Sequence, residues 1–449
     1  TTLEMLCEEG AGAIAAVAPQ LAWHFQEAGI AQKAVAYLRQ AGERAQRLYA
    51  NQEAVEHFRR ALALLQDTPP DELWWSQRRE MTAQIRESLG DVLEWTGEHD
   101  EAQMAYRGAL ADVPKGDGIW QARLHRKSGN IGRLQRRYEQ ALQAYDLAET
   151  TLGPAPAESA PAWWQEWVQI QLERMWLYYW LGQWREISEL ADQVRPTVEQ
   201  HGTPSQRISF FLSLASMYSR RDRYAVLEET LAFCQTALAI SLESENLSEI
   251  AWARFMLGFN QLWGGDLDGA EKQMQTALAL AERTGDIVHQ SRCLTYLTIL
   301  YRKRGQLDQV RQYASRSLTL ATAGQMLEYI GTAQANLAWL AWREGDLSRA
   351  EAEGQAALAS WHQLPAGHAS CAFQWTALWP LIGVALAHNR TSAASGYARA
   401  LLEATQQRLP DALTEAIKNA VTAWEESESE TARAWLDQAI VLAQELGYS

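Results

Sequence analysis

The chain has 449 residues, with 55 acidic and 40 basic side chains and a formal net charge of −15. Such an acidic surface repels a phosphate backbone, which argues against nucleic-acid binding by the chain as a whole. The four cysteines form no CxxC pair, which argues against zinc or a disulfide framework and fits a reducing compartment. No run reaches the roughly 18 uninterrupted apolar residues of a membrane span, and no signal-peptide pattern precedes the first helix, so we expect a cytoplasmic protein.

Apolar residues recur at helical spacing from the N-terminal region onward. Ala34, Leu38 and Ala41 lie at i, i+4 and i+7, which predicts one apolar stripe on a helix over 31–45. The helix that begins at Asn51 repeats this spacing. A third helical pair is expected over about 74–110, with small and apolar residues where its two helices cross and a glycine, Gly97, at the tight turn between them. These residues are Leu89, Gly90, Leu93, Gly97, Ala102, Tyr106 and Ala109.

The fourth pair keeps the small residues but places Arg136 at its turn, and residues 153–161 (GPAPAESAP) predict a linker. Three units of equal length follow further along the chain. Their turns carry Gly265, Gly305 and Gly345, which are 40 residues apart. Repeats of about 20–50 residues are typical of solenoids, in which each helical pair packs on its neighbours.

The remaining pairs are expected at about 370–405, with a kink at Pro380, and at 411–446. The sequence therefore predicts an all-α protein, a right-handed superhelical solenoid of about eleven helical pairs. We expect one domain over residues 1–449, with a sub-boundary at the 153–161 loop and a C-terminal cap at about 411–449.

The signature at Gly90, Gly97, Ala102 and Tyr106 resembles the tetratricopeptide repeat, and the 40-residue period is similar to that of MalT-like regulators. Residues 21–65 further resemble the segment that follows the nucleotide-binding module of signal-transducing ATPases. This resemblance implies a sensor arm that binds an inducer or a protein partner and releases an ATPase module, normally N-terminal in the same chain. The phosphate-binding motif GxxxxGK[ST] of that module is not found in this sequence.

No pattern of catalytic or metal-ligating residues stands out. The nine histidines form no HExxH motif, and no GxSxG motif occurs. We therefore expect no enzymatic activity, no catalytic residues, no cofactor and no metal.

The high tryptophan content, 20 residues, points to a binding surface. In repeats of this type the first helix of each pair lines the concave groove, at roughly positions 2, 5, 9, 12 and 13 of the unit. This register predicts a ligand-binding groove of aromatic and polar residues. They are Arg126, Asn130, Trp176, Tyr179, Trp252, Trp263, Arg292, Tyr296, Trp339, Trp342 and Arg343, with Arg302 and Lys303 beside them.

Several alternatives remain open. The aromatic side chains can instead pack between repeats, because they supply much buried area. A sugar, a nucleotide-like molecule or a peptide suits such a groove, and a free-standing scaffold for protein partners or head-to-tail self-assembly is compatible with the same architecture. A clamp for a peptide carboxylate is disfavoured, because Glu173 stands where an amide is required.

Overall fold

The computed structural model describes residues 11–67, 75–156, 160–244, 246–365 and 368–449. Every regular element in these ranges is a helix. None of the helices there combines the length and the apolar character needed to cross a lipid bilayer.

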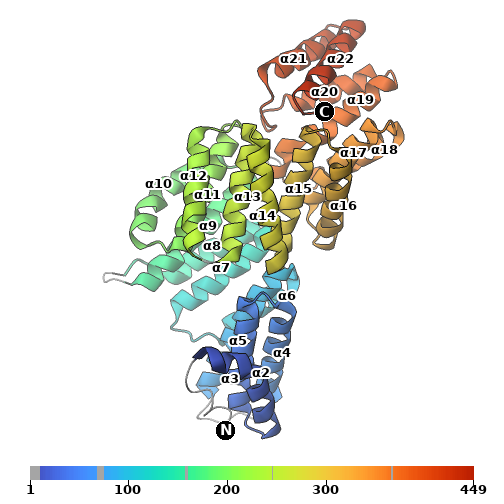
Figure 1. The fold of residues 1–449 in the computed structure, drawn as a ribbon. Coiled ribbons are helices and arrows are strands. Elements are labelled where there is room, and N and C mark those ends of the chain that lie inside the picture. Colours follow the sequence, from blue (N-terminus) through green and yellow to red (C-terminus); the bar gives the residue numbers. More distant parts are fainter. Residues whose placement is uncertain (1–10, 68–74, 157–159, 245, 366–367) are drawn as a thin grey trace. The chain divides into compact units, whose positions relative to one another are not determined.

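One helix, α2, comes first and is followed by hairpins of two helices each (Figure 1). The first eleven helices are α2 (Ala11–Glu27), α3 (Ala31–Arg47), α4 (Asn51–Asp67), α5 (Trp75–Thr96), α6 (His99–Asp112), α7 (Gly118–Leu134), α8 (Tyr138–Leu152), α9 (Pro161–Leu181), α10 (Trp184–His201), α11 (Pro204–Arg221) and α12 (Glu228–Glu243). The remainder are α13 (Leu247–Gly264), α14 (Leu267–Thr284), α15 (Ile287–Lys303), α16 (Leu307–Ala323), α17 (Leu327–Arg343), α18 (Leu347–His362), the 3₁₀ helix η1 (Ala369–Phe373), α19 (Trp375–Ala387), α20 (Thr391–Leu401), α21 (Asp411–Glu425) and α22 (Ser429–Glu445).

Contacts within the chain divide it into two compact units. Unit 1 contains Thr1–Leu177 and the short stretch Arg283–Asp286. Unit 2 contains Tyr178–Glu282 and Ile287–Ser449, so the division falls within helix α9.

The turns of the hairpins explain the repeating glycines. Gly265 has a φ of 90°, and the amide of the next residue, Asp266, donates to the carbonyl of Gln261 over 3.0 Å. A residue with a Cβ is sterically strained in this left-handed region, which is why glycine is favoured there. Arg136 nevertheless adopts the same conformation with a φ of 61°, so the turn survives without glycine.

Close helix crossings account for the recurring spacing of small and aromatic residues in several hairpins. A Cβ added to Gly90 would lie 2.5 Å from the ring of Tyr106, and one added to Gly129 would lie 2.7 Å from the ring of Tyr145. These contacts confirm that the glycine of the first helix makes room for the aromatic side chain of the second.

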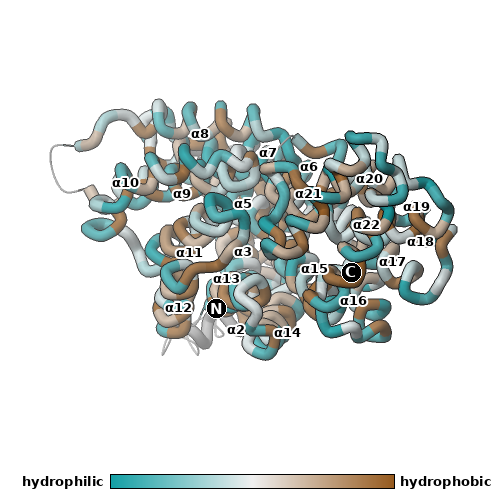
Figure 2. The backbone as a smooth tube through the Cα atoms, turned by 90° about the horizontal axis from the view of Figure 1, so that it is seen from above, coloured by the Kyte–Doolittle hydropathy of each residue, from teal (hydrophilic) through white to brown (hydrophobic). Residues whose placement is uncertain are grey.

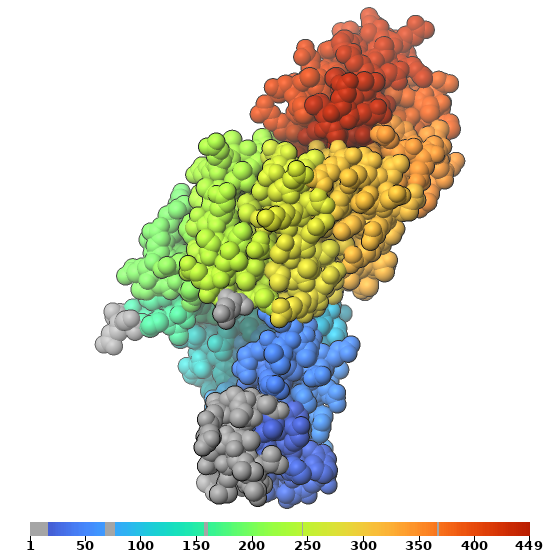
Figure 3. Space-filling model, viewed as in Figure 1, coloured from blue at the N-terminus to red at the C-terminus, as the bar shows by residue number. Residues whose placement is uncertain are grey.

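The three 40-residue units form the hairpins α13/α14, α15/α16 and α17/α18 of unit 2. Hydrophilic and hydrophobic residues alternate along most helices, as Figure 2 shows. Helix α19 is an exception in its burial, because every residue from Trp375 to Leu386 is buried. Side chains fill the space between neighbouring hairpins of this unit, which gives the unbroken surface from green to orange in Figure 3.

Two segments of unit 2 fold back onto a helix end far away in the sequence. The amide of Arg408 donates to the carbonyl of Arg223 over 2.9 Å, and Nε of Arg223 donates to the carbonyl of Gln406 over 2.8 Å. The amide of Gln407 in turn donates to Ala372 of η1 over 2.9 Å. These bonds hold η1 and the α20–α21 connection together beside the end of α11.

Candidate functional site

The first helices of the hairpins of unit 1 are α3, α5, α7 and α9, and side chains of neighbouring first helices meet along one face, which we call the inner face. Carboxylates on α5 meet polar side chains on α7 that come 36 residues later in the chain. Nε of Arg123 donates to Glu87 over 2.9 Å, and Nζ of Lys127 donates to Asp91 over 2.7 Å. One more turn along the helices, the side-chain amide nitrogen of Asn130 donates to the carboxylate of Glu94. We call these three contacts the α5–α7 ladder.

Arg126, one of the predicted ligand-binding residues, is already paired within the chain. It lies on α7, and its Nε donates to the carboxylate of Glu166 on α9 over 2.6 Å. Glu173, one further α9 carboxylate, lies 3.9 Å away. Burial alone would lower the pKa of Arg126, but the two carboxylates outweigh it and raise the pKa. The guanidinium therefore stays charged and joins α7 to α9.

Glu94 is the most perturbed carboxylate of the ladder. Its burial, together with the nearby charges of Asp91 and Glu173, raises its pKa to about 7. The Tyr106 hydroxyl donates to Asp91 over 2.8 Å and to Glu94 over 3.0 Å, and this bond with the Arg133 charge moderates the rise. Glu94 consequently changes charge near neutral pH.

We predict that Glu94 makes unit 1 less stable as the pH rises from 4.5 to 7. In this window Glu94 stays protonated in the folded chain. In the unfolded chain, where its carboxyl group has the usual pKa of 4.5, it is ionised. Stability is then lost with rising pH, by on the order of 2–3 kcal/mol across the window. Urea unfolding of the native chain and Glu94→Gln at several pH values checks this. If the free energy of unfolding depends equally on pH in both proteins, the raised pKa does not belong to Glu94.

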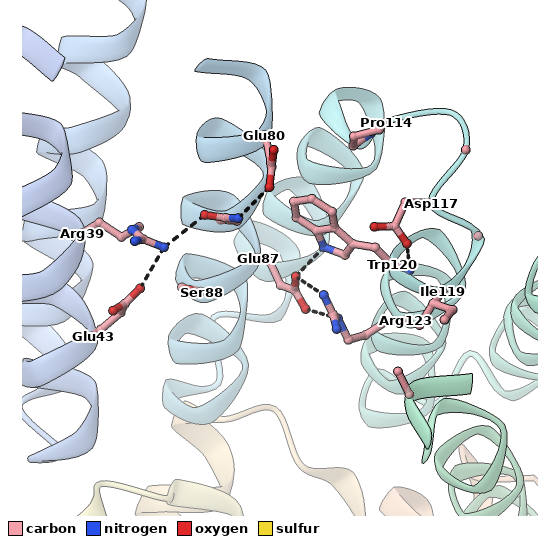
Figure 4. A pocket seen from close by; sticks show the side chains of 14 residues that line it. Arg39, Glu43, Glu80, Glu87, Ser88, Pro114, Asp117, Ile119, Trp120 and Arg123 are labelled. Atoms are coloured by element: carbon pink, nitrogen blue, oxygen red, sulfur yellow. Dashed lines mark hydrogen bonds and ion pairs between the residues drawn. The ribbon is translucent and has the colours of Figure 1, made fainter. Parts of the chain in front are cut away.

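A cleft of about 990 Å³ opens on the same inner face (Figure 4). Arg39 and Glu43 of α3 form one wall, and the opposite wall comes from α7 and the loop before it. The full lining is Arg39, Glu43, Glu80, Gln84, Glu87, Ser88, Pro114, Gly116, Asp117, Gly118, Ile119, Trp120, Arg123 and Ala162.

Hydrogen bonds hold the walls of the cleft in place. Arg39 donates to the amide oxygen of Gln84 over 3.1 Å, which joins α3 to α5. The indole N–H of Trp120 donates to Glu87 over 2.6 Å, which joins α7 to α5. Asp117 caps α7 by accepting the Trp120 amide over 2.9 Å. The polar groups of the cleft are thus positioned before any ligand arrives.

The sequence-based list of groove residues missed this cleft. Counted from Gly42, Gly90 and Gly129 as position 8, residues at positions 2, 5 and 9 of these three hairpins include Arg39, Glu43, Gln84, Glu87 and Arg123. The register that selected Arg126 and Asn130 would have selected Arg39, Glu43, Gln84 and Glu87, had it been applied to the second and third pairs. Arg123 stands at position 2 of the fourth pair, which was not among the residues selected there.

The inner face of unit 2 gathers four of the predicted residues in one aromatic cluster. The Arg292 guanidinium lies 4.8 Å from the ring centroid of Trp252, and Phe255 stacks on that ring at 5.5 Å. Tyr296 packs against Phe255 at 5.7 Å, and its ring lies 6.4 Å from that of Trp263.

The chain itself covers part of this cluster. Phe373 of η1 stacks on Trp263 with ring centroids 5.0 Å apart and an interplanar angle of 10°, and it also packs on Tyr296. Trp375, at the start of α19, lies edge-on to Trp263 at 6.4 Å. Trp263 and Tyr296 are therefore contacted by residues of their own unit at the face predicted for a ligand.

The other predicted residues have different environments. Trp339 of α17 is 0% exposed, so no ligand reaches it in this structure. Trp342 packs its ring against Gly383 of α19, whereas Arg343 is exposed. Trp176 of unit 1 is half-buried, and Tyr179 of unit 2 lies edge-on to the next ring, that of Trp180, at 5.4 Å.

Within the described ranges, no group of three or more His, Cys, Asp or Glu side chains is placed to hold a metal ion. No protein-family model matches the chain, and no curated protein matches it in sequence.

Solved structures do share its fold. A Rap protein complexed with competence and sporulation factor has a TM-score of 0.55 and 16% identity, over 82% of this chain and 96% of that chain. The Rap conjugation gene regulator of plasmid pLS20, in complex with the Phr* peptide, has a TM-score of 0.52 and 14% identity, over 73% and 95% of the two chains. A signal transduction ATPase with a tetratricopeptide-repeat sensor from Pyrococcus horikoshii has a TM-score of 0.46 and 13% identity, over 86% of this chain and 55% of that chain. The fold of this chain is that of tetratricopeptide-type helical-repeat solenoids.

Proposed function

We propose that this chain is a partner-binding sensor module that takes an extended peptide segment in the cleft between α3, α5 and α7. The observation that carries the proposal is the cleft of about 990 Å³ with its bonded walls on the inner face of three successive first helices. Small-molecule pockets span roughly 300–1,000 Å³, so this volume lies at their upper end and suits a peptide better than a small inducer.

The chemistry of the lining agrees with a peptide ligand. Ser88 offers a hydroxyl group for a peptide backbone, and the half-buried Ile119 offers apolar surface. The side-chain amide of Gln84 is bonded to Arg39 and Glu80, and Trp120 is 7% exposed, so these two residues shape the wall of the cleft. Four carboxylates (Glu43, Glu80, Glu87 and Asp117) line the cleft against two guanidinium groups, those of Arg39 and Arg123. This excess of negative charge favours a segment with basic side chains.

Two similarly folded proteins support a peptide ligand, because they were solved with competence and sporulation factor and with the Phr* peptide. The resemblance of residues 21–65 to signal-transducing ATPases adds the second part of the proposal. Peptide binding would shift the arm toward its released form and so activate an ATPase module in the same chain. A free-standing scaffold is the alternative, and a GxxxxGK[ST] motif upstream in the gene would decide for the sensor arm.

Peptide binding is expected to depend on the acidic side of the cleft. The probe is an array of immobilised short peptides of random sequence, followed by fluorescence anisotropy with the peptides retained. We expect basic peptides to be retained, and Glu80→Lys to weaken their binding about tenfold or more, which corresponds to about 1.4 kcal/mol.

The matched control is Glu139→Lys, the same charge reversal on the exposed surface of α8, a second helix of unit 1. This variant should bind as the native chain does. Retention of no peptide, or equal weakening by both reversals, would refute the cleft as the binding site.

A further inference from the structure

Three cations gather at the C-terminal ends of two first helices of unit 2. Arg302 and Lys303 are the last residues of α15, and Arg343 is the last residue of α17. The guanidinium carbons of Arg302 and Arg343 lie 5.3 Å and 5.7 Å from the ring centroid of Trp339, so the two positive charges share one aromatic ring. In the part of the chain that the structure describes, no carboxylate forms an ion pair with any of the three.

Arg302 is the most deeply buried of the three cations, with 2% of its surface exposed. Its two terminal nitrogens donate to the carbonyls of Thr376 over 2.6 Å and Tyr448 over 3.0 Å, whereas its buried Nε has no hydrogen-bond partner. Burial, reinforced by the charge of Arg343, lowers the pKa of the guanidinium well below its usual value. The carbonyl bonds therefore leave its charge only partly compensated.

Lys303 is surrounded by aromatic rings. Its Nζ lies 4.1 Å from the ring centroid of Tyr448, 5.7 Å from that of Trp375 and 5.8 Å from that of Trp263. Burial and the neighbouring Arg302 lower its pKa to about 8. The side chain nevertheless keeps some exposure to solvent, and Arg343 is fully on the surface.

Two other partly buried cations of the chain, Arg304 and Lys127, are paired with carboxylates. The next residue, Arg304, forms ion pairs with both Asp268 and Glu271 over 2.5 Å, and Lys127 pairs with Asp91 over 2.7 Å. Buried charges are normally paired in this way, because an unpaired charge loses its hydration without compensation. Cation–π contacts and the negative end of α15 offset only part of that loss. An anion next to the three side chains would compensate the remaining positive charge.

We propose that Arg302, Lys303 and Arg343 form a binding site for an oxyanion, the carboxylate or phosphate group of a ligand of unit 2. Guanidinium and ammonium groups are the donors that bind such oxygens most strongly, through charge-assisted hydrogen bonds. Lys303 and Arg343 reach solvent and meet the ligand, and Arg302 supplies charge from beneath. The Trp263 ring keeps partial exposure and offers apolar surface near Lys303, whereas the Trp375 ring is buried.

The test uses the full chain and inorganic phosphate. We expect phosphate to raise the melting temperature in a concentration-dependent manner, compared with chloride at equal ionic strength, because a ligand of the folded state stabilises it. A parallel titration with acetate distinguishes a phosphate group from a carboxylate group as the ligand. A response to phosphate alone indicates a phosphoryl ligand, and a response to both indicates a site that also accepts carboxylates.

Lys303→Gln and Arg343→Gln should each raise the apparent dissociation constant about tenfold or more. Neither change removes a buried apolar side chain, so both proteins are expected to fold. The control is Arg316→Gln, which removes an equally exposed positive charge from α16 and should leave the response unchanged. Equal stabilisation by phosphate and chloride, or an unchanged response in Lys303→Gln and Arg343→Gln, would overturn the proposal. The peptide cleft of unit 1 is untouched by these variants, so the two proposals fail separately.

Discussion

Replacing Arg126 with methionine is expected to lower the free energy of unfolding by about 3–5 kcal/mol, which is among the largest effects for a single side chain. The reason is that Glu166, itself buried, loses the guanidinium that lies 2.6 Å from its carboxylate. A buried charge without a partner costs far more than an apolar side chain in its place. Urea unfolding followed by tryptophan fluorescence measures the change.

The double variant Arg126→Met with Glu166→Leu is the control. Removing both charges leaves no unpaired group, so we expect most of the lost stability to return. If the double variant is as unstable as the single one, the cost lies in packing and not in the unpaired carboxylate. If neither variant is destabilised, the ion pair is unimportant to folding, and Arg126 is again available to a ligand.

Truncation of Trp339 to alanine is expected to cost about 3–5 kcal/mol, as is typical for deleting a fully buried indole. Its ring is 0% exposed and lies between α17 and the Arg302 guanidinium, so the variant leaves a cavity and removes a cation–π contact. Thermal and urea unfolding check this value.

Trp252→Ala provides the comparison within the same inner face. Trp252 is half-buried, and its ring meets Arg292, Phe255 and His289. We expect roughly half the loss or less for this variant, because the transfer and cavity terms both scale with buried surface. An equal loss in both variants would show that exposure in the free chain does not separate the two tryptophans.

The repeating architecture could be predicted in detail from the sequence because it is local. A hairpin needs a small residue at the crossing and a left-handed residue at the turn, and both fall within one unit. Gly90 and Tyr106 illustrate the first requirement, and Gly265 the second. Arg136 shows the limit of the rule, since a non-glycine residue holds the same turn.

The environment of each predicted groove residue could not be obtained in the same way. Trp263 and Tyr296 are contacted by Phe373, which follows them by a long stretch of chain, and Arg302 bonds to the carbonyl of Tyr448. The register states which helix face a residue occupies. It contains no information about which remote segment returns to that face.

Arg126 and Asn130 illustrate a second limit. Their chemistry indicates ligand binding, but their partners Glu166 and Glu94 stand at equivalent heights on the neighbouring first helices. Whether a polar groove residue serves a ligand or the next repeat depends on the sequence of that neighbour. The assignment of the groove residues as ligand contacts therefore stays a prediction.

The α5–α7 ladder makes these hairpins non-interchangeable. Its contacts join residues 36 positions apart, and they alternate carboxylates on α5 with donors on α7. In a consensus array any unit can be exchanged for any other. Here a copy of the α5/α6 hairpin in place of α7/α8, aligned on Gly90 and Gly129, would put Gln84, Ser88 and Asp91 at the positions of Arg123, Lys127 and Asn130 and so remove both cations of the ladder. Insertion of one residue in the middle of α5 would turn part of its acidic stripe by about 100° away from its partners. Recombination and protein engineering must accordingly keep α5–α8 together, and the Arg126–Glu166 ion pair extends this requirement to α9.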